Sequence, residues 1–264
     1  MLIVIKIGGS VITDKRKPFK IRKNVVRRLA RELKEALHSD SRLKVIIVHG
    51  GGSFGHYVAL KHLGRGKISS QGFIEIHEAM VRLNTFFIRE LRREGVLAET
   101  VHTSSAVILK NGEIFEANIK AVSGFLENRI VPVLYGDVVY DLVKGFTIVS
   151  GDTLAAFLAE KLKASLIAYV TNVNGIYRTY PPKHGLNDLI PQINLRTYNL
   201  SGKMFKHVGY DVTGGMAFKL LELKKYISCK HPIKAVIFNG LKKGFLKNIL
   251  LGKKVKVKTE IKVC

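Results

Sequence analysis

The chain has 264 residues, of which 47% are hydrophobic and 24% are charged, which excludes a disordered protein and allows one large domain or two lobes. No apolar run reaches the ~18 residues of a membrane-spanning helix, and the opening stretch MLIVIKIGG lacks a basic leader and a cleavage site, so we expect a cytoplasmic protein. Two cysteines, Cys229 and Cys264, provide neither a disulfide framework nor the spacing of metal ligands.

The chain is strongly basic. It carries 44 Lys and Arg against 20 Asp and Glu, a formal net charge of +24. Such an excess is compatible with a polyanionic partner. The basic residues are spread along the whole chain, however, and are not interleaved with aromatic residues in a stacking pattern. We interpret the charge as a solvated, lysine-rich surface and keep RNA binding as an alternative.

Apolar runs alternate with amphipathic stretches through the first half of the chain. They predict buried strands at Leu2–Ile7, Lys44–His49 and Ile130–Tyr135. Amphipathic helices are predicted at Arg22–His38 and Gln71–Arg93, where apolar residues recur at helical spacing.

Two hairpins and a series of shorter elements complete the pattern. Asn111-Gly112 within VILKNGEIFEA predicts one hairpin, which a short helix follows, and Lys144-Gly145 within VVYDLVKGFTIV predicts another. In the second half, helices are expected at Asp152–Lys163, Thr213–Ile227 and Gly244–Leu251, and strands at Ser165–Thr171 and Lys234–Asn239. The segment Arg178–His207 is expected to be irregular.

Strands that alternate with helices indicate an α/β fold with a mainly parallel sheet and the hairpins as insertions at its rim. The C-terminal KKVKVKTEIKV alternates Lys with Val or Ile, which predicts a strand with one wet face at the edge of the sheet. No linker separates the two halves, so we expect them to share one sheet.

Four glycine clusters follow predicted strands, where ligands of parallel α/β sheets bind: Gly8-Gly9, Gly50-Gly51-Gly52, Gly151 and Gly214-Gly215. Glycine lets a backbone come close to a ligand, and a helix that starts there adds partial positive charge. Tight turns alone would also use glycine. Because three of the clusters are accompanied by Lys, Ser, Thr or His, we favour anion binding over turns alone.

Two familiar phosphate motifs do not apply. The P-loop pattern is absent from the sequence. GGGSFG matches the dinucleotide pattern at Gly50, Gly52 and Gly55, but that site needs a strand ending in an acidic residue ~20 positions later. Glu75 instead lies within a helical pattern, so we reject a dinucleotide site.

Three lysines lie beside the glycine clusters. Lys6 interrupts a strand that is otherwise apolar, Lys15 closes SVITDK, and Lys219 follows DVTGGM. Because an unpaired buried lysine is costly, we expect Lys6 to face an anion or a buried carboxylate. Asp152, after VSG, is the natural candidate, and an aspartate between two lysines could orient both.

These motifs together resemble the amino acid kinase superfamily. KIGGS, HGGG, SGD, TNVNGIY and DVTGGMAFK occur in its order and span nearly the whole chain. The resemblance implies a single domain over residues 1–264 that forms a three-layer αβα sandwich. It also implies that residues 1–150 bind the phosphoryl acceptor and that residues 151–264 bind ATP.

Within that superfamily, GGGSFGH and SVITDK resemble the isopentenyl phosphate kinases, and QGFIEIHEAMVRLN resembles their substrate helix. The resemblance implies ATP-dependent phosphorylation of isopentenyl phosphate to isopentenyl diphosphate, by in-line transfer between phosphates, in the archaeal mevalonate route. It also implies Mg²⁺ held mainly through the phosphates, with no metal ligands on the protein, and a homodimer. The alternatives are a kinase of another small phosphate or phosphonate, or a basic kinase-fold protein that binds RNA.

The resemblance assigns roles residue by residue. It implies catalytic roles for Lys6, Lys15, His56, Asp152 and Lys219. It implies contact with ATP for Lys6, Gly8, Gly9, Ser10, Gly51, Gly52, Asn172, Gly175, Gly215 and Lys219. It implies contact with the acceptor for Gly50, Gly55, His56, Phe73, Ile76, Met80, Leu83 and Gly151. The usual TDVDG is TNVNG here, so Asn172 and Asn174 keep hydrogen bonding but lose two negative charges toward the nucleotide.

The chemistry is consistent with these roles. An acceptor phosphate has a second pKa near ~6 and is already a nucleophile at neutral pH, so no general base is required. His56 is then expected to donate a hydrogen bond to the acceptor phosphate, and His49, at the end of a strand, to be structural.

Overall fold

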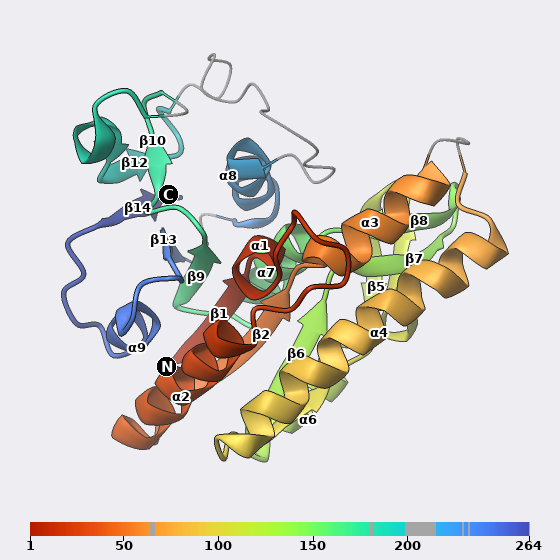
Figure 1. Cartoon of the computed structure of the whole chain (residues 1–264), viewed down its shortest axis with the longest axis horizontal. Coiled ribbons are helices and arrows are strands. Elements are labelled where there is room, and N and C mark those ends of the chain that lie inside the picture. The colour runs from red at the N-terminus through yellow and green to blue at the C-terminus, as the bar shows by residue number, and fades with distance from the viewer. Residues whose placement is uncertain (64–66, 180–181, 199–214, 229, 232, 264) are drawn as a thin grey trace.

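The computed structural model describes residues 1–63, 67–179, 182–198, 215–228, 230–231 and 233–263 (Figure 1). Outside these ranges lie Gly214 of the fourth glycine cluster, the predicted helix start at Thr213, and the cysteines Cys229 and Cys264.

A large eight-stranded sheet forms the centre of the molecule, in the order β12-β14-β13-β9-β1-β2-β6-β3. In that order the strands are Gln192–Asn194, Lys258–Lys262, Lys234–Asn239, Leu166–Thr171, Leu2–Ile7, Lys44–His49, Val131–Tyr135 and Ala98–Thr100. All neighbouring strands are parallel except β13 and β14. The central strands are almost wholly apolar because helices cover both faces of the sheet.

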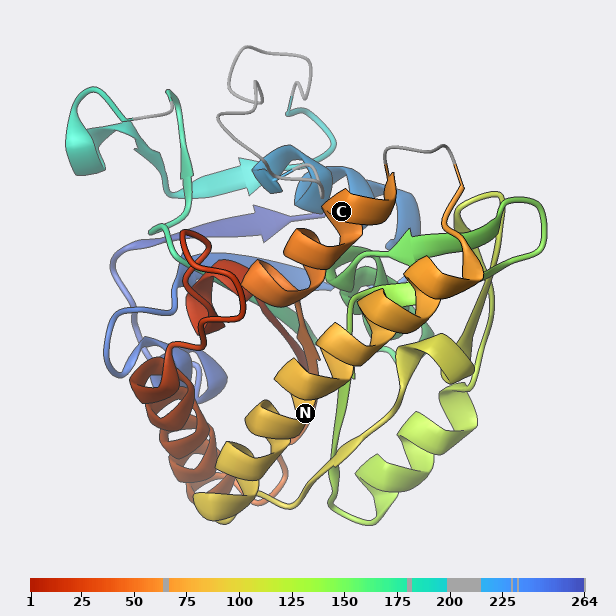
Figure 2. The same cartoon turned by 45° about the vertical axis from the view of Figure 1, so that its right-hand side comes forward.

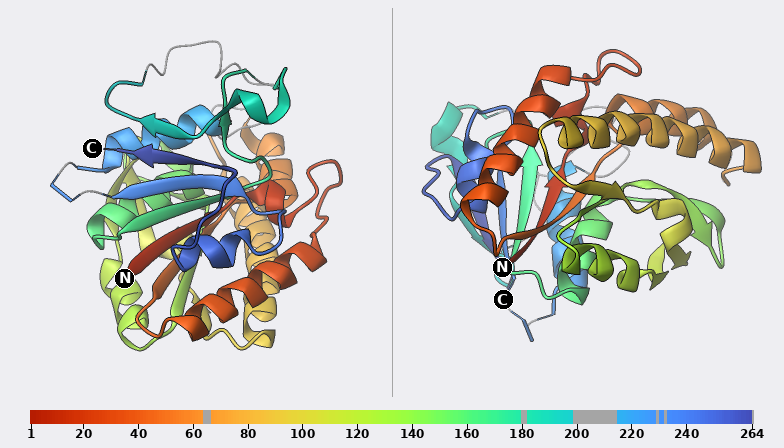
Figure 3. Two further views of the ribbon diagram at one scale, coloured as in Figure 1. Left: turned by 90° about the vertical axis from the view of Figure 1, so that its left-hand side faces the viewer. Right: turned by 90° about the horizontal axis from the view of Figure 1, so that it is seen from below.

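Helices on the two faces produce three layers (Figure 3). On one face pack α1 (Gly9–Ile12), α2 (Lys23–Ser39), α4 (Ser70–Arg93) and α9 (Phe245–Leu250). Figure 2 shows α4 running along this face beside α2. On the other face pack α6 (Ile119–Glu127), α7 (Gly151–Lys161) and α8 (Gly215–Tyr226). The predicted αβα class with a mainly parallel sheet is therefore confirmed.

Both predicted hairpins form, and together they make a second sheet in the order β5-β4-β7-β8. Its strands are Glu113–Ala117, Val107–Lys110, Asp137–Asp141 and Gly145–Val149. Asn111 and Gly112 both have positive φ, as a type I′ hairpin turn requires. The buried carboxylate of Asp141 accepts backbone N–H bonds from Asn111, Gly112, Val143 and Lys144, so one side chain holds both hairpin turns together.

The prediction that the C-terminal strand lies at an edge is wrong. β14 lies between β13 and β12, and its outer side pairs with β12 through Gln192↔Glu260 and Ile193↔Ile261. Ile193 of β12 is almost fully buried. Burial of this apolar side chain stabilises the pairing of the short β12 with β14.

Several elements have no counterpart in the sequence prediction. Helix α3 (Gly52–Leu63) begins inside the triglycine stretch, and β3 and α5 (Thr103–Ala106) follow α4. The segment predicted as irregular contains β11 (Leu189–Ile190), which pairs with β10 (Ile176–Tyr177), as well as β12 and a 3₁₀ turn at Gly185–Asp188. None of the helices in the described ranges is long and apolar enough to span a membrane.

Candidate active site

A cavity of about 750 Å³ opens among the segments that follow β1, β2 and β6. Residues of α3, α4, α7, α8 and the second sheet complete its wall. Among the residues predicted for the site, its lining includes Lys6, Gly8, Gly9, Ser10, Lys15, Gly50, Gly51, Gly55, His56, Ile76, Met80, Gly151, Asp152 and Lys219. The predicted residues outside the lining are Gly52, Phe73, Leu83, Asn172, Gly175 and Gly215.

Two lysines share one buried carboxylate in this cavity. Lys6 Nζ lies 2.8 Å from Asp152 Oδ1, and Lys219 Nζ lies 3.1 Å from Asp152 Oδ2. All three residues are at least nine-tenths buried. Burial by itself would raise the pKa of Asp152, but the charges of Lys219 and Lys6 outweigh it and hold that pKa below its usual value. The group therefore carries one net positive charge, which favours an anionic ligand.

The sequence places Asp152 where an anion is favoured. Ser150 caps α7, with its hydroxyl accepting the Thr153 N–H at 3.0 Å, and Asp152 lies in the first turn. The partial positive charge at a helix start stabilises a carboxylate there.

The glycine loops after β1 and β2 touch each other. A Cβ on Gly9 would lie 2.2 Å from Gly52 N, and a Cβ on Gly50 would lie 3.0 Å from Gly9 N. The amides of Gly8 and Gly50 donate to Val170 O and Ile7 O at 2.8 and 2.9 Å. The close approach of the Gly52 backbone is therefore enough to require glycine at position 9, whether or not a ligand binds there. The amides of Gly8 and Gly50 are already used in hydrogen bonds that extend the sheet.

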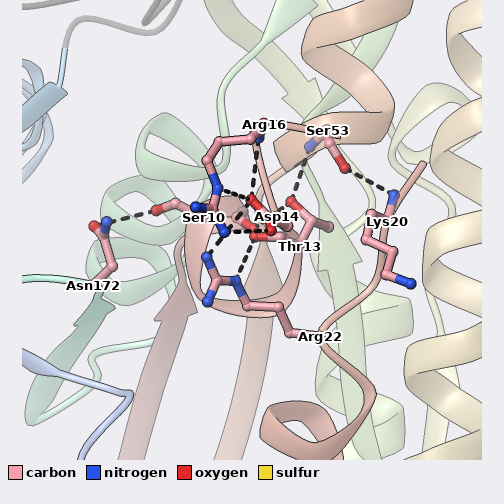
Figure 4. A network of polar contacts seen from close by, with 9 residues as sticks. Ser10, Thr13, Asp14, Arg16, Lys20, Arg22, Ser53 and Asn172 are labelled. Atoms are coloured by element: carbon pink, nitrogen blue, oxygen red, sulfur yellow. Dashed lines mark hydrogen bonds and ion pairs between the residues drawn. The ribbon is translucent and has the colours of Figure 1, made fainter. Parts of the chain in front are cut away.

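Figure 4 shows the polar contacts that hold the segment from Thr13 to Arg22. Asp14 accepts hydrogen bonds from the Arg16 side chain at 3.0 and 2.9 Å, which lower the pKa of the Asp14 carboxyl. Arg22 donates to Thr13 O at 3.0 Å. Lys15 lies between these anchors, exposed and in the cavity lining.

The helix predicted to bind the acceptor, α4, supplies part of the apolar wall, beside Ala59, Ile148, Val149 and Phe218 from other elements. Ile76 and Met80 line the cavity, and a Cβ on Gly55 would lie 2.7 Å from Met80 Sδ. Leu83, one further turn along, is fully buried in the main core. Phe73 packs against Phe146 of β8, with ring centroids 4.7 Å apart.

The two asparagines predicted to lie toward the nucleotide both make interactions within the protein. Asn172 Oδ1 accepts from the Ser10 hydroxyl at 3.3 Å, which links the segments after β9 and β1. Asn174 accepts from the Asn239 amide at 3.1 Å and donates to the Tyr177 hydroxyl at 2.9 Å. Amide groups can both donate and accept in this way, which carboxylates cannot.

The remaining predicted glycines have local reasons for their identity. Gly175 has φ 157°, and a Cβ there would lie 2.4 Å from Thr259 Oγ1. Gly215 has φ 58° at the start of α8, and its carbonyl accepts from Lys219 Nζ at 3.3 Å.

Sequence reasoning missed several polar residues in the cavity wall. Asp137, which follows β6 and Gly136, lies 2.8 Å from His77 Nδ1. Burial raises the pKa of Asp137, and the hydrogen bond that His77 donates to Asp137 raises the pKa of His77. The strand-end position that singled out other site residues also applies to Asp137. Other polar residues in the lining that were missed are Asn111, Glu113, Lys144, Thr147, Ser150, Thr153, Glu222 and Lys225.

His49 has the structural character expected of it. It is fully buried, and its two ring nitrogens contact Gly50 O at 3.2 Å and Asn84 Oδ1 at 3.1 Å. Burial lowers the pKa of His49 to about 4, so the ring is neutral at pH 7.

Comparison with known proteins identifies the family. The profile of the amino acid kinase family matches residues 1–239. The chain is 35% identical to an isopentenyl phosphate kinase of Methanocaldococcus jannaschii, covering 96% of each chain. It is 32% identical to that of Methanothermobacter thermautotrophicus, covering 97% of each.

Solved structures agree with the sequence matches. An X-ray structure of isopentenyl phosphate kinase superposes with a TM-score of 0.82 at 30% identity, covering 99% of this chain and 100% of the other. An aspartate kinase from Synechocystis shares only the fold, with a TM-score of 0.70 at 15% identity over 40% of its length. The chain therefore belongs to the amino acid kinase family and, within it, to the isopentenyl phosphate kinases.

Proposed function

We propose that this chain phosphorylates isopentenyl phosphate to isopentenyl diphosphate with ATP, in isoprenoid biosynthesis by the archaeal mevalonate route. The observation that carries the proposal is one cavity lined both by the Lys6–Asp152–Lys219 group and by Ile76 and Met80. A cationic group suits the phosphates of both substrates, and an apolar wall suits a short hydrocarbon tail. The relatives named as isopentenyl phosphate kinases support the same acceptor.

In the proposed reaction, an oxygen of the acceptor phosphate attacks the γ-phosphorus of ATP in line with the leaving group. The bond from that phosphorus to the β–γ bridging oxygen breaks, and ADP departs with the bond's electron pair. The acceptor is ionised at neutral pH, so the protein has to bring two anions together rather than remove a proton.

Each residue type in the cavity has a part in that task. Lys6 and Lys219 would stabilise charge on the transferring phosphoryl group, with Asp152 holding both ammonium groups. Because the amides of Gly8 and Gly50 donate to carbonyl oxygens of the sheet, the amides of Gly9, Ser10 and Gly51, which line the cavity, are the better candidates to donate to phosphate oxygens. His56 would donate to the acceptor phosphate, and Lys15 would meet the phosphates from the exposed side.

The donor set suits ATP but offers no protein cage for Mg²⁺. No group of three or more His, Cys, Asp or Glu that could hold a metal occurs in the part of the chain described here, and Asp152 is occupied by two lysines. The ion would therefore be held mainly through phosphate oxygens. When bound with ATP, Mg²⁺ neutralises charge on the β- and γ-phosphates.

We further infer a division of labour and an assembly. Residues 1–150 would bind the acceptor, because they supply His56, Ile76 and Met80, and residues 151–264 would bind ATP together with the glycine loops after β1 and β2. We propose a homodimer on the basis of the family resemblance, which light scattering after size-exclusion chromatography would test.

The test of function is a panel of acceptors incubated with Mg·ATP and followed by ³¹P NMR. Isopentenyl phosphate is expected to give the two coupled resonances of a diphosphate. Other small phosphates and phosphonates, uridylate and N-acetylglutamate serve as comparisons. Robust turnover of one of these with none of isopentenyl phosphate would contradict the assignment. RNA affinity that falls steeply with salt, without ATP turnover, would favour the RNA-binding alternative.

A further inference from the structure

We propose that Thr13 is a positioning residue for phosphoryl transfer, whose hydroxyl fixes the glycine loop after β1 to the glycine loop after β2. The inference rests on the proposed function for its kinetic consequence. Its structural basis is independent of that function.

The hydroxyl of Thr13 bonds to both loops, and Figure 4 shows its contact with Ser53. Its Oγ1 donates to Gly9 O at 2.8 Å and accepts the Ser53 N–H at 2.9 Å. Thr13 has no solvent exposure, and Ser53 is 5% exposed, so water does not compete for these bonds. The same side chain therefore closes a bridge between the segments that follow two neighbouring parallel strands.

The Ser53 N–H has a particular need for this acceptor. Ser53 lies in the first turn of α3, where backbone N–H groups have no partner within the helix. Thr13 supplies from another loop the oxygen that an N-cap side chain normally supplies. Loss of the hydroxyl would leave that N–H buried without this acceptor, whereas Gly9 O would keep the bond from Thr13 N at 2.9 Å.

The surrounding backbone leaves the hydroxyl little freedom. A Cβ on Gly52 would lie 2.0 Å from Thr13 Oγ1, so the glycine makes room for it. Around Ser53, the carbonyl accepts from Phe19 N at 3.3 Å and the hydroxyl accepts from Lys20 N at 3.2 Å. The segment around Lys15 is thereby attached to the start of α3 as well.

The bridge sets the relative position of groups that would contact different substrates. Gly9 belongs to the loop proposed to contact ATP, and His56, three residues after Ser53 on α3, would contact the acceptor. Transfer between two bound phosphates requires reacting atoms about 3–3.5 Å apart, and a misplacement of about 1 Å can cost roughly 10²-fold in rate. Thr13 thus acts on the reaction through the spacing of the two loops.

The experiment compares Thr13→Val, which removes the hydroxyl at similar size, with Thr13→Ser, which keeps it. We expect Thr13→Val to lower kcat roughly tenfold or more, with smaller changes in KM, and Thr13→Ser to retain most of kcat. Thr103→Val is the matched control. Thr103 is also fully buried, its hydroxyl donates to Tyr135 O at 2.6 Å and accepts from Tyr135 N at 3.3 Å, and it does not line the cavity. It should lower the melting temperature without lowering kcat.

A second measurement does not depend on activity. Hydrogen exchange of the ligand-free protein should be faster at the Ser53 amide in Thr13→Val and unchanged there in Thr103→Val. If the wild type fails to phosphorylate isopentenyl phosphate, the proposed function is wrong, while hydrogen exchange still tests the bridge.

Three results would overturn the inference. They are a folded Thr13→Val with wild-type kcat, a Thr13→Ser as impaired as Thr13→Val, and an unchanged rate of exchange at Ser53. If Thr13→Val does not fold, Thr13→Cys takes its place, because a thiol is a weaker donor and acceptor than a hydroxyl. A wild-type kcat in that variant would be equally contrary.

Discussion

Lys6, the penultimate residue of β1, reaches Asp152 in the first turn of α7, with Nζ 2.8 Å from Oδ1. The contact joins residues 146 positions apart in sequence, and it explains how a lysine can be buried in the middle of an apolar sheet. The other carboxylate oxygen of Asp152 contacts the ammonium of Lys219. Two ammonium groups therefore share one carboxylate, which neutralises only one of their two positive charges. The remaining positive charge faces the cavity.

The two lysines are expected to act on kcat. Lys6→Ala and Lys219→Ala should each lower kcat on the order of 10²-fold or more, because the charge is needed most where charge moves in the transition state. Lys224→Ala, an exposed position on the same helix as Lys219, is the control and should keep wild-type rates. Steady-state kinetics, with melting temperatures to verify folding, decide the matter. Near-normal kcat in both lysine variants would mean that the lysines are structural.

The apolar wall is expected to set the length of the acceptor. Ile76→Ala and Met80→Ala should admit longer isoprenoid phosphates, because both side chains line the cavity. Leu83→Ala is a matched control on the same helix face. Leu83 lies in the core, so its truncation should cost roughly 2–5 kcal/mol of stability without changing the preference. Competition between isopentenyl, geranyl and farnesyl phosphate gives the measurement, and an unchanged preference in Ile76→Ala and Met80→Ala would contradict it.

His56 is expected to give a graded series. His56→Gln should retain part of the activity, because glutamine can still donate a hydrogen bond to the acceptor phosphate. His56→Ala should lose much more, since that donor disappears. A general base would behave differently, because neither variant accepts a proton at neutral pH. Comparing kcat/KM for the acceptor distinguishes the two roles, and equal, near-complete inactivation of folded variants would show that His56 acts as a base.

The pair formed by His77 and Asp137 is expected to make stability depend on pH. The hydrogen bond to Asp137 raises the pKa of His77 above its ordinary value of 6.5. The contribution of the His77–Asp137 pair to the free energy of unfolding is therefore fully present below about pH 6.5. It is lost as the pH rises through the raised pKa that His77 has in the folded protein. His77→Gln should thus destabilise the protein more at pH 6 than at pH 9.

Urea unfolding of wild type and His77→Gln at both pH values gives that comparison. In an Asp137→Asn background the pH dependence of the His77 effect should disappear, which supplies the control. A loss of stability that is equal at pH 6 and pH 9 in the wild-type background would be inconsistent with the pair.

Much of the fold can be predicted from the sequence, because the long strands and helices show a local periodicity of apolar residues. The apolar runs at Leu2–Ile7 and Lys44–His49 matched β1 and β2, and the prediction of Gln71–Arg93 was within one residue of α4. Predictions were weaker for short elements whose pairing partners are distant. β12 has three residues, and only its contact with β14 makes it a strand, which is also why β14 is not at the edge.

By itself the sequence determined the fold class, the order of the glycine motifs after their strands and the candidate lysines around Asp152, because strand ends in a parallel sheet converge. Only the tertiary structure decided which residues meet there. It brings Gly9 against Gly52, adds Asp137 and Lys144 to the cavity wall, and turns Leu83 into the core while Ile76 remains in the wall. It also gives the Thr13 hydroxyl its two partners. These contacts depend on how loops and helices from distant parts of the chain pack in three dimensions, which helical and strand periodicity do not encode.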